Sequence, residues 1–61
     1  MGRRRRLHDP AWRVREMAAK VAARHELGDL LQDLEQLRGD PNRRVRVAAE
    51  LALTRITAAR G

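Results

Sequence analysis

Apolar residues recur with the period of an α-helix in three separate stretches of the chain. The first apolar stripe, which predicts a helix over about residues 10–24, consists of Val14, Met17, Ala18 and Val21. The second, which predicts a helix over about residues 27–38 with Gly39 as its stop, consists of Leu27, Leu30, Leu31, Leu34 and Leu37. The third helix would run to about residue 59, with a core face made by Val45, Ala49, Ala52, Leu53 and Ile56. These patterns predict an all-α protein of about three antiparallel helices.

The first and third helices begin with the same residues, offset by 31 positions. Over the 22 positions that can be compared, seven pairs are identical: Asp9/Asp40, Pro10/Pro41, Arg13/Arg44, Val14/Val45, Arg15/Arg46, Ala18/Ala49 and Arg24/Arg55. Each Asp-Pro pair suits the start of a helix, because Asp caps free amide groups and Pro fits the first helical position. A fixed period of this size indicates stacked structural repeats.

The pattern Asp-Pro-x-x-x-Val-Arg-x-x-Ala, present twice with a leucine-rich helix between its copies, resembles the HEAT-like helical repeats of bacterial proteins, the PBS-lyase type. In that family each repeat is a pair of antiparallel helices, and the repeats stack into a solenoid. The resemblance implies one complete repeat over residues 9–39 and the first helix of a second repeat over residues 40–61. Residues 1–8 remain as an arm that we expect to be basic and flexible.

The resemblance also implies roles for single residues. Val14 and Val45 would lie in the core, and Arg15 and Arg46 would bond to neighbouring carboxylates of the Asp40 and Asp9 type. His25 stands where the second copy has Ile56, and we expect it at the edge of the core rather than in a ligand or proton-transfer role. Trp12, in the first turn of its helix, would pack against a neighbouring helix or repeat.

The two copies differ on one further face of the helix. Glu16 and Lys20, which form a favourable pair four residues apart, become Val47 and Leu51 in the second copy. A helix with apolar residues on two sides needs two neighbours, and the second repeat has no second helix to supply one. We therefore expect an interaction surface at Val47, Leu51, Leu53 and Ala58. It would serve a second copy of the chain (a dimer), another protein, or the remainder of a longer solenoid.

The net charge of +6, with 13 Arg and one Lys, raises a second possibility, non-specific binding of nucleic acid. The contacts would come from the arm and the starts of the two Val-Arg helices: Arg3, Arg4, Arg5, Arg6, Arg13, Arg15, Arg43, Arg44 and Arg46. The second helix is acidic and would repel a duplex. A single Trp argues against a stacking platform for single strands.

Other classes of function find little support in the sequence. There is no Cys, and the two His have no partner pattern, so we expect no disulfide, no metal and no cofactor. No apolar run approaches the roughly 18 residues of a membrane span. No catalytic motif or phosphate loop is present, so we expect neither an enzyme nor a small-molecule substrate. A cytoplasmic location fits by default.

Overall fold

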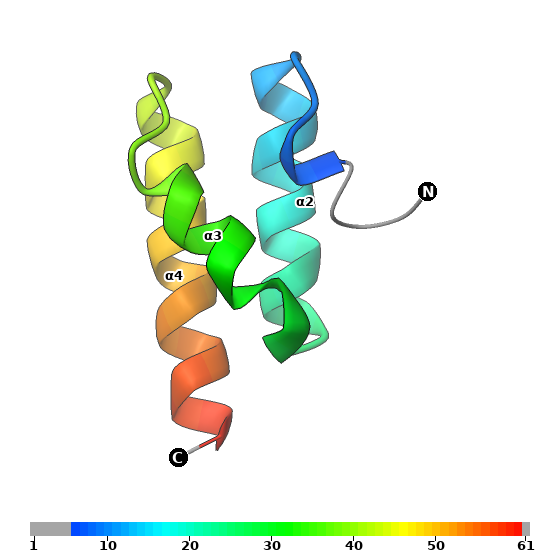
Figure 1. Ribbon diagram of the computed structural model, residues 1–61, viewed down its shortest axis with the longest axis vertical. Helices are drawn as coiled ribbons and strands as arrows, with labels where there is room; N and C mark the ends of the chain where they lie inside the picture. Colours follow the sequence, from blue (N-terminus) through cyan, green and yellow to red (C-terminus); the bar gives the residue numbers. More distant parts are fainter. Residues whose placement is uncertain (1–5, 61) are drawn as a thin grey trace.

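The computed structural model describes residues 6–60, and over this range the predicted all-α fold is confirmed. The main elements are the helix α2 (Trp12–Arg24), the 3₁₀ helix η1 (Gly28–Leu30), the helix α3 (Leu31–Leu37) and the helix α4 (Arg43–Arg60). Figure 1 shows α2 and α4 side by side and running in the same direction. The shorter α3 lies across one face of this pair and returns the chain from the end of α2 to the start of α4.

Both long helices begin two residues later than the sequence predicted, at Trp12 and Arg43. The Asp9 carboxylate accepts the N–H of Ala11 at 2.8 Å, and the Asp40 carboxylate accepts the N–H of Asn42 at 2.8 Å. Each Asp therefore closes a turn just ahead of its helix, because its short side chain reaches the backbone two residues on. The prediction that Asp caps the helix and Pro occupies its first position is wrong for this reason.

The connection after α2 also differs from the prediction. The chain leaves the helix at His25 and turns at Glu26, whose φ of 52° lies in the left-handed region. The predicted single helix over about 27–38 is the 3₁₀ turn η1 followed by α3, which ends at Leu37, with Arg38 at its C-cap and Gly39, the expected stop, directly after it. His25 is exposed, so the expectation of a position at the core edge is wrong, whereas Ile56 at the equivalent position is fully buried.

The core lies where the three helices meet. On α4 it contains Val45, Ala49, Ala52 and Ile56, as predicted, and also Ala48, while Leu53 is half-buried. On α3 and η1 it contains Leu30, Leu34 and Leu37. On α2 it contains Ala18, Ala19 and Ala22, and the N-terminal segment adds Leu7.

The core face of α2 is rotated relative to the predicted stripe. Met17 is 60% exposed and Val21 is 39% exposed, so both were wrongly assigned to the core, while Ala19 and Ala22 are fully buried. Alanine side chains are short, and they allow the backbones of α2 and α4 to approach closely. The position of α4 therefore decides which side of α2 is buried, even though Met17 and Val21 lie on another side.

Candidate functional site

The same arginine contact is built at the start of both long helices. Arg15 Nη1 donates to the carbonyl oxygens of Asp9 at 2.8 Å and Pro10 at 3.0 Å. In the second copy, Arg46 Nη1 donates to the carbonyl oxygens of Asp40 at 2.8 Å and Pro41 at 3.2 Å. Each Val-Arg pair thus ties its own helix to the Asp-Pro turn that precedes it, and the sequence repeat is also a repeat of geometry.

The two copies are joined by the other edge of the Arg15 guanidinium. Its Nε donates to Asp40 Oδ2 at 2.7 Å and its Nη2 donates to Asp40 Oδ1 at 3.1 Å. This is a two-point pairing of the kind that makes Arg–carboxylate bonds strong and directional. The predicted bond from Arg15 to a carboxylate of the Asp40 type is therefore confirmed.

Asp40 is the buried acidic residue at this junction, with 7% of its surface exposed. Burial by itself raises the pKa of Asp40, but hydrogen bonds from the Arg15 side chain and the Asn42 N–H, together with the charges of Arg15 and Arg46, hold that pKa below its ordinary value of 3.8. Asp40 is consequently ionised at neutral pH. Loss of either partner would leave the other as a poorly compensated buried charge.

The outer side of α4 exposes the apolar residues that the sequence indicated. Val47 is 47% exposed and Leu51 is 65% exposed, one turn apart on the helix. Their counterparts in α2 have ionic partners: Glu16 bonds to Lys20 at 3.3 Å and to Arg44 of α4 at 3.3 Å. Val47 and Leu51 are therefore solvent-exposed side chains with no equivalent in the first copy.

The two other predicted interface residues lie on a neighbouring part of α4. Half-buried Leu53 and exposed Ala58 help to line an open groove between α3 and α4. The groove also includes Leu31, Glu35, Glu50 and Thr54. The four predicted residues thus form two adjacent surfaces on one helix rather than a single patch. We call the groove, together with Arg46, which lies one turn before Glu50 on the same helix, the α4 end of the molecule.

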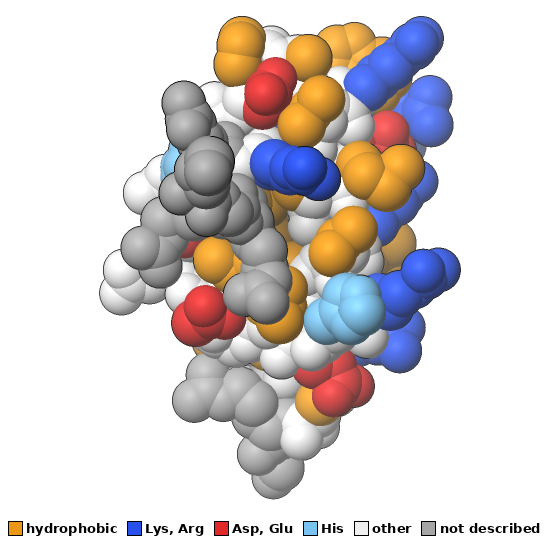
Figure 2. All heavy atoms as spheres, turned by 90° about the vertical axis from the view of Figure 1, so that its right-hand side faces the viewer, with side chains coloured by type: hydrophobic (Ala, Val, Ile, Leu, Met, Phe, Trp, Pro, Cys, Tyr) orange, Lys and Arg blue, Asp and Glu red, His pale blue; other side chains and the backbone are white. Residues whose placement is uncertain are grey.

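A second exposed apolar surface lies at the opposite end, on α2, and the sequence pattern missed it. Figure 2 shows this face, where hydrophobic side chains gather beside a border of basic ones. On α2, the helix at this side of the molecule, Met17 and Val21 are exposed, and half-buried Asp9 lies before the start of the same helix. The signal was present in the repeat, since Met17 and Val21 stand where the second copy has Ala48 and Ala52. We call this surface, together with Asp9, the α2 end.

Trp12 sits between the two copies and contacts basic side chains from both. The guanidinium carbons of Arg13 and Arg44 lie 5.2 Å and 5.3 Å from the centre of its ring. Trp12 is half-buried and packs against the core, so its predicted contact with a neighbouring helix is confirmed. It helps to fasten α4 onto α2.

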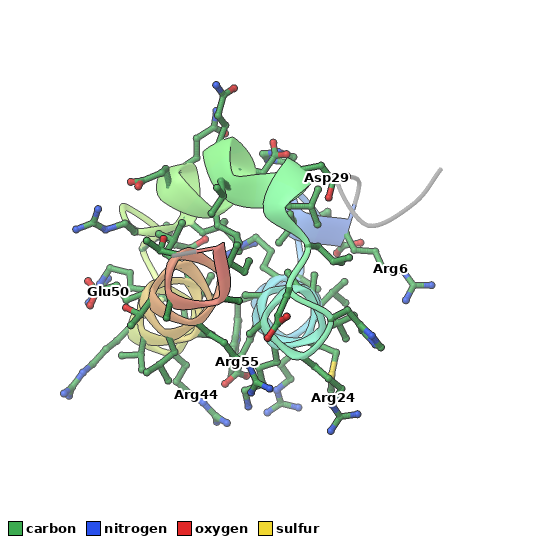
Figure 3. The ribbon with its side chains drawn as sticks, turned by 90° about the horizontal axis from the view of Figure 1, so that it is seen from below. Arg6, Arg24, Asp29, Arg44, Glu50 and Arg55 are labelled. Atoms are coloured by element: carbon green, nitrogen blue, oxygen red, sulfur yellow. The ribbon has the colours of Figure 1, made fainter. Side chains whose placement is uncertain are left out.

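The structure divides the predicted nucleic-acid contacts. Arg3, Arg4 and Arg5 lie outside the described residues. Arg15 is held by Asp40, and Arg44 by Glu16 and Trp12, while Arg6, Arg13 and Arg43 are exposed and Arg46 uses one of its nitrogens on carbonyls. Figure 3 shows Arg24, Arg44 and Arg55 on the side of the α2–α4 pair that faces away from α3. Arg24 and Arg55 were not among the predicted contacts.

Comparison with protein-family models, with curated proteins and with solved structures finds no match to this chain. Across residues 6–60, no helix combines the length and the apolar character that crossing a bilayer requires. Within the same range, no cluster of three or more His, Asp or Glu side chains could hold a metal ion.

Proposed function

We propose that this protein is a HEAT-like interaction module that binds a second copy of itself or another protein through α4. The observation that carries the proposal is the exposure of Val47 and Leu51, at 47% and 65%, where the first copy has a paired Glu16 and Lys20. Large apolar side chains adjacent on one helix turn favour burial against a partner. The groove that includes Leu53 and Ala58 lies on an adjacent surface of the same helix.

The charges around this surface suit a protein partner. Glu35 and Arg38 at its α3 border form a pair at 3.1 Å, and Glu50 adds a negative charge on α4. A border of mixed charge around apolar side chains is typical of protein–protein interfaces. A small domain of this length is also marginally stable alone, and association would add to its stability.

The molar mass in solution, measured by size exclusion with light scattering over a concentration series, tests the proposal. We expect a dimer or a larger species, and we expect Leu51→Glu to shift the series toward the monomer, because a charge would then have to be buried in the interface. The matched control is Gln32→Glu, which adds the same charge at an exposed position at the start of α3.

A wild-type chain that stays monomeric and folded at every concentration would contradict self-association. If wild type associates and Leu51→Glu has the same molar mass at each concentration, the outer side of α4 is not part of the interface. Circular dichroism of each variant verifies that the fold is retained.

A second candidate function is non-specific binding of nucleic acid, and the arrangement of Arg24, Arg44 and Arg55 on the face opposite α3 favours it. Their phosphate contacts would replace condensed counterions, so affinity for random duplex should fall steeply with salt. We expect Arg55→Ala to weaken binding of the duplex. The control is Arg38→Ala, which should leave the affinity unchanged because Arg38 is paired with Glu35 on α3. Affinity that is flat between low and high salt would contradict this mechanism.

A further inference from the structure

The two ends of the molecule carry complementary halves of one contact. Arg46 donates through Nη1 to the carbonyls of Asp40 and Pro41, and over residues 6–60 its Nε and Nη2 have no hydrogen-bond acceptor. In the first copy these same two nitrogens of Arg15 hold the carboxylate of Asp40. The α4 end therefore presents an arginine that is already positioned as Arg15 is, with the carboxylate-binding edge unused.

The α2 end presents the matching carboxylate. Asp9 Oδ1 accepts the N–H of Ala11 at 2.8 Å, as Asp40 Oδ1 accepts the N–H of Asn42 at 2.8 Å. Asp40 also receives two bonds from an arginine of the preceding copy, whereas no guanidinium of the described chain bonds to the Asp9 carboxylate. Asp9 is thus oriented by its turn like Asp40, but within residues 6–60 no arginine side chain bonds to its carboxylate.

The apolar surfaces at the two ends are complementary in the same way as the charged groups. Ala48 and Ala52 are buried, at 4% and 0% exposed, on a helix packed against α2, while their counterparts Met17 and Val21 are exposed at the α2 end. In the other direction, Ala22 is fully buried, and its counterpart Leu53 lines the open groove at the α4 end. Each end therefore leaves exposed the positions that the contact between the copies buries inside the molecule.

From these observations we propose that the chain stacks head to tail on a second copy of itself. The α4 end of one copy lies against the α2 end of the next, and Arg46 of the first pairs with Asp9 of the second. In this stack, α4 of one molecule packs beside α2 of the following molecule in the way that α2 packs beside α4 within one molecule. This inference rests on the proposed self-association of the chain through α4, and it places the contact at Arg46 and the groove rather than at Val47 and Leu51.

The contact between copies is expected to be weaker than the contact within one. Glu50 and Thr54 stand at the positions of Ala19 and Ala23, so the two helices cannot approach as closely as α2 and α4 do. The ion pair therefore sets the register of the stack. Because the two surfaces are different, such an assembly does not close at two copies and grows with concentration.

Two variants, each blocking one end, test the stacking. Asp9→Asn keeps the oxygen that accepts the Ala11 N–H but removes the charge at the α2 end, and Arg46→Gln removes the guanidinium at the α4 end. Light scattering is measured on each variant and on their equimolar mixture, at about 0.15 M salt, where repulsion between the +6 chains is screened beyond about 8 Å. We expect each variant alone to associate about 30-fold more weakly than wild type, because one partner of the charge pair is gone.

The mixture gives the decisive result. The unaltered Asp9 of the Arg46→Gln chain pairs with the unaltered Arg46 of the Asp9→Asn chain, so a heterodimer forms. Both outer ends of that heterodimer are blocked, and we expect nothing larger. A symmetric dimer through Val47 and Leu51 would not show this complementation, since neither variant alters that surface.

Three outcomes overturn the stacking. If wild type associates and both single variants associate equally well, or if the mixture behaves as the average of the two variants, the ends do not meet, while self-association through α4 still stands. If wild type remains monomeric throughout, both the stacking and the self-association fail. Circular dichroism verifies folding, and Arg46→Lys, which keeps one donor for the carbonyls but loses the two-point geometry, replaces Arg46→Gln if the latter unfolds.

Discussion

The two copies of the Asp-Pro-x-x-x-Val-Arg pattern are nearly the same in local geometry and differ in what surrounds them. Arg15 and Arg46 make the same pair of bonds to the carbonyls of their own turns. Over residues 6–60, only Arg15 continues to a carboxylate, because the Asp40 turn of the second copy lies beside it. The comparison teaches that the pattern has two functions: one arginine edge fixes the helix start, and the other is directed at the next repeat.

The flanks of the two long helices show the same difference. Met17 and Val21 are exposed on α2, whereas Ala48 and Ala52 at the equivalent positions of α4 are buried. Conversely, Ala19 is buried and its counterpart Glu50 is exposed. Equivalent positions therefore have opposite environments, since α2 has a neighbour on one flank and α4 on the other.

The largest expected effect comes from removing the carboxylate that joins the copies. Asp40→Asn should lower the free energy of unfolding by about 3 kcal/mol, because it leaves the Arg15 charge without its buried partner. That is a large part of the roughly 3–9 kcal/mol expected for a domain of this length. Urea unfolding followed by circular dichroism measures it.

The equivalent change in the first copy provides the control. Asp9→Asn keeps the turn and removes a charge that no described arginine holds, so the free energy of unfolding should stay within about 0.5 kcal/mol of wild type at monomeric concentrations. Similar losses for Asp9→Asn and Asp40→Asn would mean that the two copies are energetically equivalent, against the comparison.

A smaller effect should appear as acid destabilisation. The folded-state pKa of Asp40 lies below 3.8, so the unfolded chain takes up that proton more readily than the folded one. The stabilisation by Asp40 is therefore complete above pH 3.8 and is lost as the pH falls through the lower folded-state pKa. Asp9→Asn should retain this acid-dependent loss of stability, and Asp40→Asn should lack the part of it that comes from protonation of Asp40. If the free energy of unfolding of wild type and of Asp40→Asn falls in parallel with pH, Asp40 makes no such contribution.

The smallest predicted effect concerns Trp12. Arg44→Ala removes a cation–π contact and a bond to Glu16 across the two copies, and should cost about 0.5–1 kcal/mol. The equivalent Arg13 contacts Trp12 only within its own helix, so Arg13→Ala should cost less than about 0.5 kcal/mol. Thermal unfolding followed by Trp fluorescence compares the two variants. A larger loss of stability for Arg13→Ala than for Arg44→Ala would contradict the prediction that the contact between the copies matters more.

Much of the fold could be predicted from periodicity alone. The stripes of α3 and α4 named the buried residues Leu34, Leu37, Val45 and Ile56 correctly, because these large apolar side chains lie on the faces where α3 and α4 meet. The stripe of α2 misled, since bulky Met17 and Val21 suggested a core that is made instead by Ala19 and Ala22. Side-chain size shows which residues prefer burial, but not on which flank the neighbouring helix lies.

For the candidate site, the sequence by itself determined the repeat of the Asp-Pro and Val-Arg pairs and the exposed Val47 and Leu51, all of which follow from residue type and spacing. Only the tertiary structure decided that Arg15 reaches Asp40 while the matching edge of Arg46 is left without a carboxylate in the described chain. The physical reason is that a guanidinium bond to a residue 25 positions away depends on how two helices are placed side by side. Local sequence positions the donor, and the packing of α4 against α2 supplies the acceptor.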